Sequence, residues 1–176
     1  MSDARPIGVF DSGIGGITVL KALRAALPHE DLVYLGDTAR LPYGTKSPET
    51  VTAYATQATK HLLNHDVKMV VIACNTASSV ALDPLTRALA PIPVIGVIEP
   101  GARAGAGATK TGRIGVIATE ATVKGGAYER AIHKAMPEAE VTQAPCGLFV
   151  TLAEEGWVKG EVAEAAAKRY LAPLFK

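Results

Sequence analysis

Residues that build special architectures are scarce in this sequence. Only two cysteines and four histidines occur among its 176 residues, and aromatic side chains make up 5%. Two cysteines exclude a disulfide scaffold, and they form no metal-ligand spacing with the scattered histidines. The few aromatic residues exclude a stacking platform for nucleic acid. We therefore expect no bound metal, and we expect free thiols.

The sequence has no large excess of charge of one sign and no long apolar run. Lys and Arg number 18 against 17 Asp and Glu, which leaves a net charge of +1. Such a balance provides no strong field to attract nucleic acid or an anionic membrane. No apolar run approaches about 18 residues, and the first apolar segment is too short for a signal peptide. We expect a cytoplasmic protein with neither nucleic-acid nor membrane partners.

Short β-branched runs alternate with longer helical patterns along the chain. The strand-like runs are 7–10, 32–35, 69–73, 94–98, 114–118 and 141–144, and the helix-like stretches are 17–27, 48–64, 78–89, 122–136 and 162–170. Near-continuous apolar strands that alternate with helices are typical of a parallel sheet covered on both faces. The sequence therefore predicts a doubly wound α/β protein.

A stretch rich in Gly and Ala, 100–112, separates the fourth and fifth predicted strands. It predicts a boundary between an N-terminal lobe, 1–98, and a second lobe, 99–176. An ordinary loop with one helical turn is the alternative. The second lobe would hold only two strands, which is too few for a stable sheet. We therefore expect these residues to be part of a longer protein.

Small polar or ionisable residues follow most of the predicted strands. Ligands of open α/β sheets bind at the carboxyl ends of the strands, so we expect the functional site there. The residues at these ends are Asp11, Ser12, Asp37, Cys74, Asn75, Thr76, Glu99 and Thr119.

Three segments carry the candidate chemistry. The turn Asp11–Gly16 lacks both the dinucleotide fingerprint and the P-loop lysine, but its amides could hold an anion; a plain strand-to-helix turn is the alternative. Cys74 ends a strand before a helix, which is expected to lower its pKa and favours a reactive thiol over a structural one. Pro42–Gly44 suits a carboxylate pocket. Cys146 is interpreted as structural.

Seven segments, in order along the chain, together resemble the glutamate racemases of the aspartate/glutamate racemase superfamily. They are Phe10–Gly16, Gly36–Thr38, Pro42–Gly44, Ala73–Ser78, Val97–Pro100, Ile117–Thr122 and Glu154–Gly156. The resemblance covers the N-terminal part of the family sequence. It implies two pseudo-symmetric Rossmann-like lobes, of which the second lobe and the closing strands would be incomplete here.

The resemblance also implies an isomerase that interconverts L- and D-glutamate without a cofactor and supplies D-glutamate for peptidoglycan synthesis, and thus for cell-wall biogenesis and cell shape. Two cysteines would exchange protons on opposite faces of the substrate, with Cys74 as the first. Asp11 and Asp37 would assist it, and Glu154 would support the opposite side. The substrate-binding residues would be Asp11, Ser12, Pro42, Tyr43, Gly44, Asn75, Thr76, Thr119 and Thr122. Family members often form homodimers.

One departure from the family pattern concerns the second cysteine. In the family it lies in a Gly-Cys-Thr-His segment that these 176 residues do not contain. Cys146 matches a different cysteine, so we expect this chain alone not to invert glutamate. Two alternatives stay open: a module that binds a dicarboxylate or a partner without catalysis, and a racemase or isomerase for aspartate or another small acid. Pro42–Gly44 favours glutamate.

Overall fold

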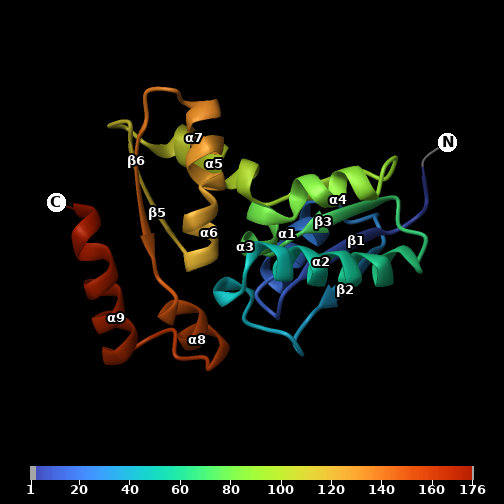
Figure 1. Cartoon of the computed structure of the whole chain (residues 1–176), viewed down its shortest axis with the longest axis horizontal. Helices are drawn as coiled ribbons and strands as arrows, with labels where there is room; N and C mark the ends of the chain where they lie inside the picture. Colours follow the sequence, from blue (N-terminus) through green and yellow to red (C-terminus); the bar gives the residue numbers. More distant parts are fainter. Residues whose placement is uncertain (1–2, 176) are drawn as a thin grey trace. The chain divides into compact units, whose positions relative to one another are not determined.

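The structure is a computed structural model that describes residues 3–175, and the chain divides into two compact units, 1–97 and 98–176 (Figure 1). The units are described separately below. Whether the predicted lobes, 1–98 and 99–176, fold as independent domains stays a prediction. Within residues 3–175, no helix is both long and apolar enough to cross a membrane.

The first unit contains a four-stranded parallel sheet. Its strands are β1 (Ile7–Asp11), β2 (Leu32–Gly36), β3 (Met69–Ile72) and β4 (Val94–Gly96). The spatial order is β2-β1-β3-β4, and every pairing is parallel. This confirms the predicted α/β class with a parallel sheet. Because β1 and β3 are central neighbours, the residues that follow them are brought side by side.

Helices cover both faces of this sheet. They are α1 (Ile17–Ala26), α2 (Pro48–Leu63), α3 (Asn75–Val80) and α4 (Leu82–Ala88). In β1, Ile7 and Val9 pack with apolar residues of α1, whereas Phe10 belongs to the core that α2, α3 and α4 help to build. The alternation follows from the two-residue period of a strand, and it makes the sheet doubly wound.

Local capping sets two of the helix boundaries. Ser47 caps α2, as its Oγ accepts the Thr50 N–H at 3.3 Å, and Pro48 is the first helical residue, as predicted. The helix predicted over 78–89 begins earlier and is split into α3 and α4. The prediction was wrong there because Cys74 itself caps α3, so that the helix starts directly after it.

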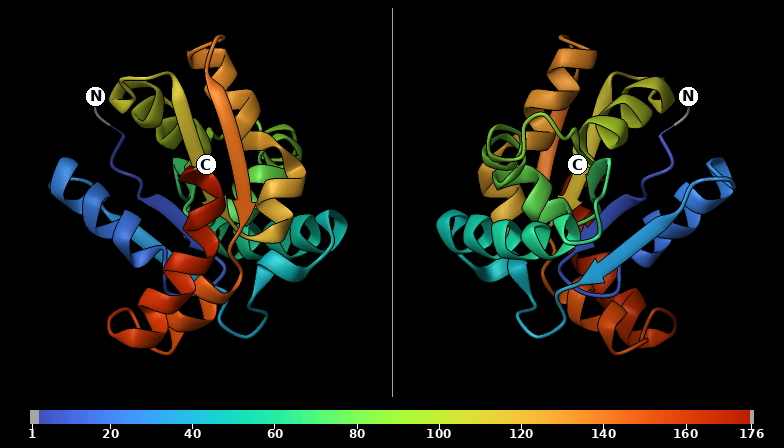
Figure 2. Two further views of the ribbon diagram at one scale, coloured as in Figure 1. Left: turned by 90° about the vertical axis from the view of Figure 1, so that its left-hand side faces the viewer. Right: turned by 90° about the vertical axis from the view of Figure 1, so that its right-hand side faces the viewer.

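The second unit pairs two parallel strands, β5 (Arg113–Ala118) and β6 (Glu140–Pro145), which run side by side (Figure 2). Its helices are α5 (Ile98–Ala108), α6 (Glu120–Gly125), α7 (Ala127–Ala135), α8 (Leu148–Glu154) and α9 (Glu161–Leu171). Its core combines Ala102 of α5, Val116 of β5 and Ile132 of α7. Helix α8 was not predicted from the sequence. Helices α6 and α7 were predicted as one helix, but Gly126, which has a left-handed backbone conformation, separates them.

The alternative of an ordinary loop with one helical turn over 100–112 was wrong, because most of this stretch lies in helix α5. Pro100 is tolerated in the first turn, where backbone N–H groups have no intrahelical partner. Gly101 lets α5 approach Tyr128, whose hydroxyl would lie 3.2 Å from an added Cβ. Glu99 is therefore not at a strand end: it is exposed and paired with Lys134 at 2.7 Å.

We predict that Gly36→Ala destabilises the first unit. An added Cβ would lie 2.3 Å from the carbonyl oxygen of Gly13, so the backbone would have to shift. We expect the free energy of unfolding to fall by about 1–3 kcal/mol in urea denaturation. Gly15→Ala is the matched control, because its Cβ would meet no atom within 4 Å. Equal unfolding midpoints for both variants would contradict the close approach.

Candidate functional site

The carboxyl ends of β1, β2 and β3 are tied together by backbone hydrogen bonds that continue past the ladders. The Asp37 N–H donates to the Asp11 carbonyl at 2.9 Å, and the Ala73 N–H donates to the Phe10 carbonyl at 2.7 Å. Asp11 lies opposite Gly36 in the strand register. These bonds fix the positions at which Asp11, Asp37 and Cys74 leave the sheet.

Asp11 is buried inside the turn that follows β1. Its Oδ2 accepts the backbone N–H of Gly13 at 2.9 Å. Gly16 packs so closely on Asp11 that an added Cβ would lie 2.5 Å from the Asp11 Cβ. The turn is therefore built around this carboxylate, and one of the amides proposed for an external anion is already occupied by Asp11.

Cys74 and Ser12 meet although they are 62 positions apart. The Cys74 thiol donates to the Ser12 Oγ at 3.2 Å, and the Cys74 sulfur accepts the Ala77 N–H at 3.4 Å. The cysteine is buried, with 6% of its surface exposed. The structure thus places the thiol among hydrogen-bonding groups, where a proton can move to or from sulfur.

The expected lowering of the Cys74 pKa was wrong. Burial raises the pKa of the Cys74 thiol above its ordinary value, and the Asp11 charge acts in the same direction. Hydrogen bonds with Ser12 and Ala77 favour the thiolate but do not outweigh burial. The reason is that α3 is short and a desolvated sulfur anion is costly. The resting form is the neutral thiol.

Asp37 forms a second buried group, in the loop after β2. Its Oδ2 accepts the Tyr43 hydroxyl at 2.5 Å and pairs with the Arg40 Nε at 2.6 Å. Tyr43 begins the short helix η1 (Tyr43–Thr45), and its ring contacts Phe10 and Tyr54. Burial raises the pKa of Tyr43 far above its usual range, with a further rise from Asp37. Tyr43 therefore stays a neutral donor to the carboxylate.

Four further predicted residues of the first unit lie in or next to the short helices that follow β2 and β3. Pro42 precedes η1, and Gly44 is buried within it. Asn75 and Thr76 open α3 directly after Cys74, and Thr76 is buried. The structure thus brings together, at one sheet edge, Asp11, Ser12, Asp37, Pro42, Tyr43, Gly44, Cys74, Asn75 and Thr76.

The second unit carries the other predicted residues. Thr119 caps α6, its Oγ1 accepts the Thr122 N–H at 3.4 Å, and the two hydroxyls lie 2.9 Å apart. Thr122 is buried. Glu154 is the last residue of α8 and is exposed. Cys146 is buried, as a structural role would require, and burial raises its pKa. That these residues share a site with the first unit stays a prediction.

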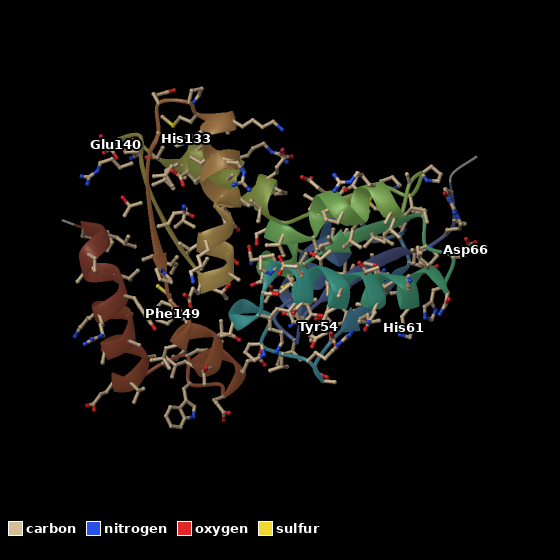
Figure 3. The ribbon with its side chains drawn as sticks, viewed as in Figure 1. Tyr54, His61, Asp66, His133, Glu140 and Phe149 are labelled. Atoms are coloured by element: carbon tan, nitrogen blue, oxygen red, sulfur yellow. The ribbon has the colours of Figure 1, made fainter. Side chains whose placement is uncertain are left out.

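Arg40 and the residues that contact it were not predicted from the sequence as part of the site. Arg40 pairs with Asp37, stacks on Tyr54 and contacts Gln57. Tyr54, which is labelled in Figure 3, and Gln57 both lie on α2. A signal was present: an acid and a base three positions apart, just after a strand. Among residues 3–175, no group of three or more His, Cys, Asp or Glu side chains could hold a metal ion.

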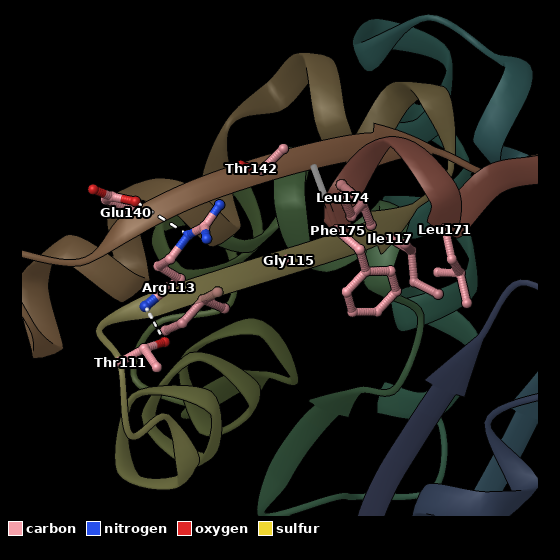
Figure 4. Close-up of a pocket in the computed structure, with 10 residues that line it drawn as sticks. Thr111, Arg113, Gly115, Ile117, Glu140, Thr142, Leu171, Leu174 and Phe175 are labelled. Atoms are coloured by element: carbon pink, nitrogen blue, oxygen red, sulfur yellow. Dashed lines mark hydrogen bonds and ion pairs between the residues drawn. The ribbon is translucent and has the colours of Figure 1, made fainter.

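A groove of about 470 Å³ lies in the second unit, on β5 and β6 (Figure 4). Its polar end holds the Arg113–Glu140 pair at 3.3 Å, and its apolar end holds Leu171, Leu174 and Phe175. None of the predicted site residues lines this groove. It is therefore separate from the candidate chemistry.

The fold and the site define a doubly wound α/β protein with a cysteine and two aspartates at the carboxyl ends of parallel strands. The chain belongs to the Asp/Glu/Hydantoin racemase family, whose model matches residues 17–174.

Several relatives support this assignment. The glutamate racemase of Geobacter metallireducens is 56% identical over 97% of this chain, and that of Chlorobaculum parvum is 51% identical. The crystal structure of glutamate racemase from Francisella tularensis in complex with D-glutamate matches 97% of the chain at 49% identity, with a TM-score of 0.90. The chain spans 63% of the length of the two curated relatives and 64% of that solved chain.

We predict that Cys74 reacts slowly near neutral pH. In a Cys146→Ser background, which leaves Cys74 as the single thiol, the midpoint of its alkylation by iodoacetamide with pH should lie above that of the same thiol in the unfolded chain, because burial raises the Cys74 pKa. Mass spectrometry of timed samples gives the rate. Unfolding in urea should return the midpoint to about 8.5. A midpoint in the folded chain at or below that of the unfolded chain would overturn the assignment of a buried thiol.

We predict that Tyr43→Phe destabilises the first unit by about 1.5–3 kcal/mol at neutral pH, since the bond to a carboxylate is lost. Tyr54→Phe removes a hydroxyl from the neighbouring ring and is the matched control. Because the pKa of Tyr43 is higher in the folded than in the unfolded chain, the contribution of Tyr43 to the free energy of unfolding is fully present below the unfolded pKa. That contribution is lost as the pH rises above the unfolded pKa. The difference between wild type and Tyr43→Phe should therefore narrow above about pH 10 in urea titrations. A difference independent of pH would contradict the raised pKa.

Proposed function

We propose that this chain supplies the Cys74 side of a cofactor-independent glutamate racemase. The observation that carries the proposal is the buried Cys74 thiol bonded to Ser12, on a sheet edge shared with Asp11 and Asp37. Membership of the racemase family and the names of the relatives support glutamate as the substrate.

Racemisation requires a proton to leave one face of the substrate Cα and another to arrive on the opposite face. The neutral Cys74 thiol is suited to donate a proton to the carbanion on its side. In the reverse direction, its thiolate removes that proton. The ammonium group of a bound amino acid would favour the thiolate, because a nearby positive charge stabilises the anion.

The carboxylates and hydroxyls around Cys74 would orient the substrate. Asp11 and Asp37 supply negative charge for the ammonium, and the neighbouring Ser12, Asn75 and Thr76 supply hydrogen-bonding groups. In the second unit, the Thr119–Thr122 hydroxyl pair suits a substrate carboxylate. Glu154 is proposed to support the base on the opposite face. The substrate-binding roles of Pro42, Tyr43 and Gly44 belong to the same proposal.

The opposite face requires a second base. The family resemblance assigns it to a Gly-Cys-Thr-His segment, which these residues do not contain. We therefore propose that a longer protein carries out the full interconversion, in the cytoplasm, as a homodimer, and for peptidoglycan synthesis. The 176-residue chain would exchange the α-hydrogen on one face only.

The test is α-deuterium incorporation into D- and L-glutamate in D₂O, followed by NMR, with circular dichroism to detect inversion. Wild type should exchange one enantiomer without net inversion. Cys74→Ser should lower that exchange by about 10²–10⁴-fold, as is usual for a lost acid–base group. Cys146→Ser is the matched control and should exchange as wild type does.

Three outcomes would contradict the proposal. Unchanged exchange by Cys74→Ser would remove the role of Cys74. Loss of exchange in Cys146→Ser alone would move the role to Cys146. Two-way inversion by the 176-residue wild type would show that the second base lies within these residues.

A further inference from the structure

The guanidinium of Arg40 contacts a carboxylate, an aromatic ring and an amide side chain of the first unit. Its Nε lies 2.6 Å from the Asp37 Oδ2, its guanidinium carbon lies 4.4 Å from the centre of the Tyr54 ring, and its Nη1 donates to the Gln57 Oε1 at 2.5 Å. Its side chain is 28% exposed, whereas Asp37 is 8% exposed. The guanidinium is therefore held by α2 on one side and by the buried carboxylate on the other.

The two carboxylate oxygens of Asp37 differ in their contacts with these residues. Both the Arg40 Nε and the Tyr43 hydroxyl bond to Oδ2. The other oxygen, Oδ1, takes part in neither of these two contacts. Because Oδ2 is bonded twice, rotation of the carboxylate is restricted.

The charge of Asp37 is a second reason for an arginine at position 40. A buried carboxylate is costly unless a positive group accompanies it, and a guanidinium is the cation best suited to such a partly buried pair. Tyr54 adds a cation–π contact, which stabilises the guanidinium at this position. The ring of Tyr54 also contacts Tyr43, at 5.7 Å between centroids. Arg40 and Tyr43 thus each contact both Asp37 and Tyr54.

We propose that Arg40 is a positioning residue for the reaction at this site: it holds Asp37 and Tyr43 so that the Asp37 Oδ1 faces the bound amino acid. The inference rests on the proposed function, and it adds a residue that the family resemblance did not assign. Arg40 itself need not touch the substrate, since its charged group is engaged by Asp37, Tyr54 and Gln57.

The test compares Arg40→Gln, which removes the charge, with Arg40→Lys, which keeps it. Arg24→Gln is the control, because Arg24 is a first-unit arginine on α1 whose guanidinium donates to the Glu30 carbonyl. For α-deuterium exchange from glutamate, Arg40→Gln should lower kcat by about 10–100-fold with little change in KM, as a small misplacement of a reacting group does. Arg40→Lys should recover part of the loss, and Arg24→Gln should match wild type. All variants are compared under conditions in which urea denaturation shows them to be folded.

A second measurement is independent of turnover. The Tyr43 hydroxyl proton, assigned by its absence in Tyr43→Phe, should exchange slowly with solvent in the NMR spectrum of the wild type. It should remain in Arg40→Lys and be lost in Arg40→Gln, because Asp37 is then free to rotate. A merely structural arginine would change the urea midpoint without this pattern.

The outcomes separate the two proposals. If Arg40→Gln keeps both the wild-type kcat and the hydroxyl proton, the positioning role is wrong. If Arg40→Lys is as impaired as Arg40→Gln, packing on Tyr54 and not charge is what matters, and the inference is again wrong. If the wild type exchanges no glutamate, the proposed function fails, and the hydroxyl proton alone decides the role of Arg40.

Discussion

The parallel pairing of β1 with β3 is the constraint on which the candidate site depends. It places the turn after Asp11 beside the helix that begins after Cys74, so that Ser12 and the thiol can bond across a long stretch of sequence. The backbone bonds that continue past the strands tie Asp37 to the same edge. Apolar alternation in β1 and β3 secures the pairing, because both faces of each strand are covered by helices. The packing of the core thus determines where the polar residues of this sheet edge lie.

Two carboxylates at this edge are stabilised in different ways. Asp11 is held by a backbone amide of its own turn and is enclosed by a glycine. Asp37 is held by side chains, a tyrosine hydroxyl and a guanidinium, that come from the following loop. A carboxylate fixed by backbone tolerates little rearrangement, whereas one fixed by side chains depends on the packing of α2 beneath them. The site therefore combines a rigid element with one that single substitutions can loosen.

Much of the fold was readable from the sequence, because strand runs such as 32–35 and the cap at Ser47 are local signals. The edge residues Asp11, Asp37 and Cys74 followed from the rule that ligands meet parallel strands at their carboxyl ends. Helix α5 was missed because Gly and Ala gave it the composition of a linker, while its stability comes from packing against Tyr128 and Ile132. The direction of the Cys74 pKa could not be predicted, since burial is a property of the folded chain. Arg40 escaped notice because its partners lie on another element.

The burial of Cys74 in its neutral form has a consequence for chemical damage. Peroxide attacks the thiolate, and oxidation proceeds from sulfenic to irreversible sulfinic and sulfonic acids. A buried sulfur that stays protonated gives an oxidant little to attack. The same desolvation that makes the anion costly thus protects the residue from oxidation.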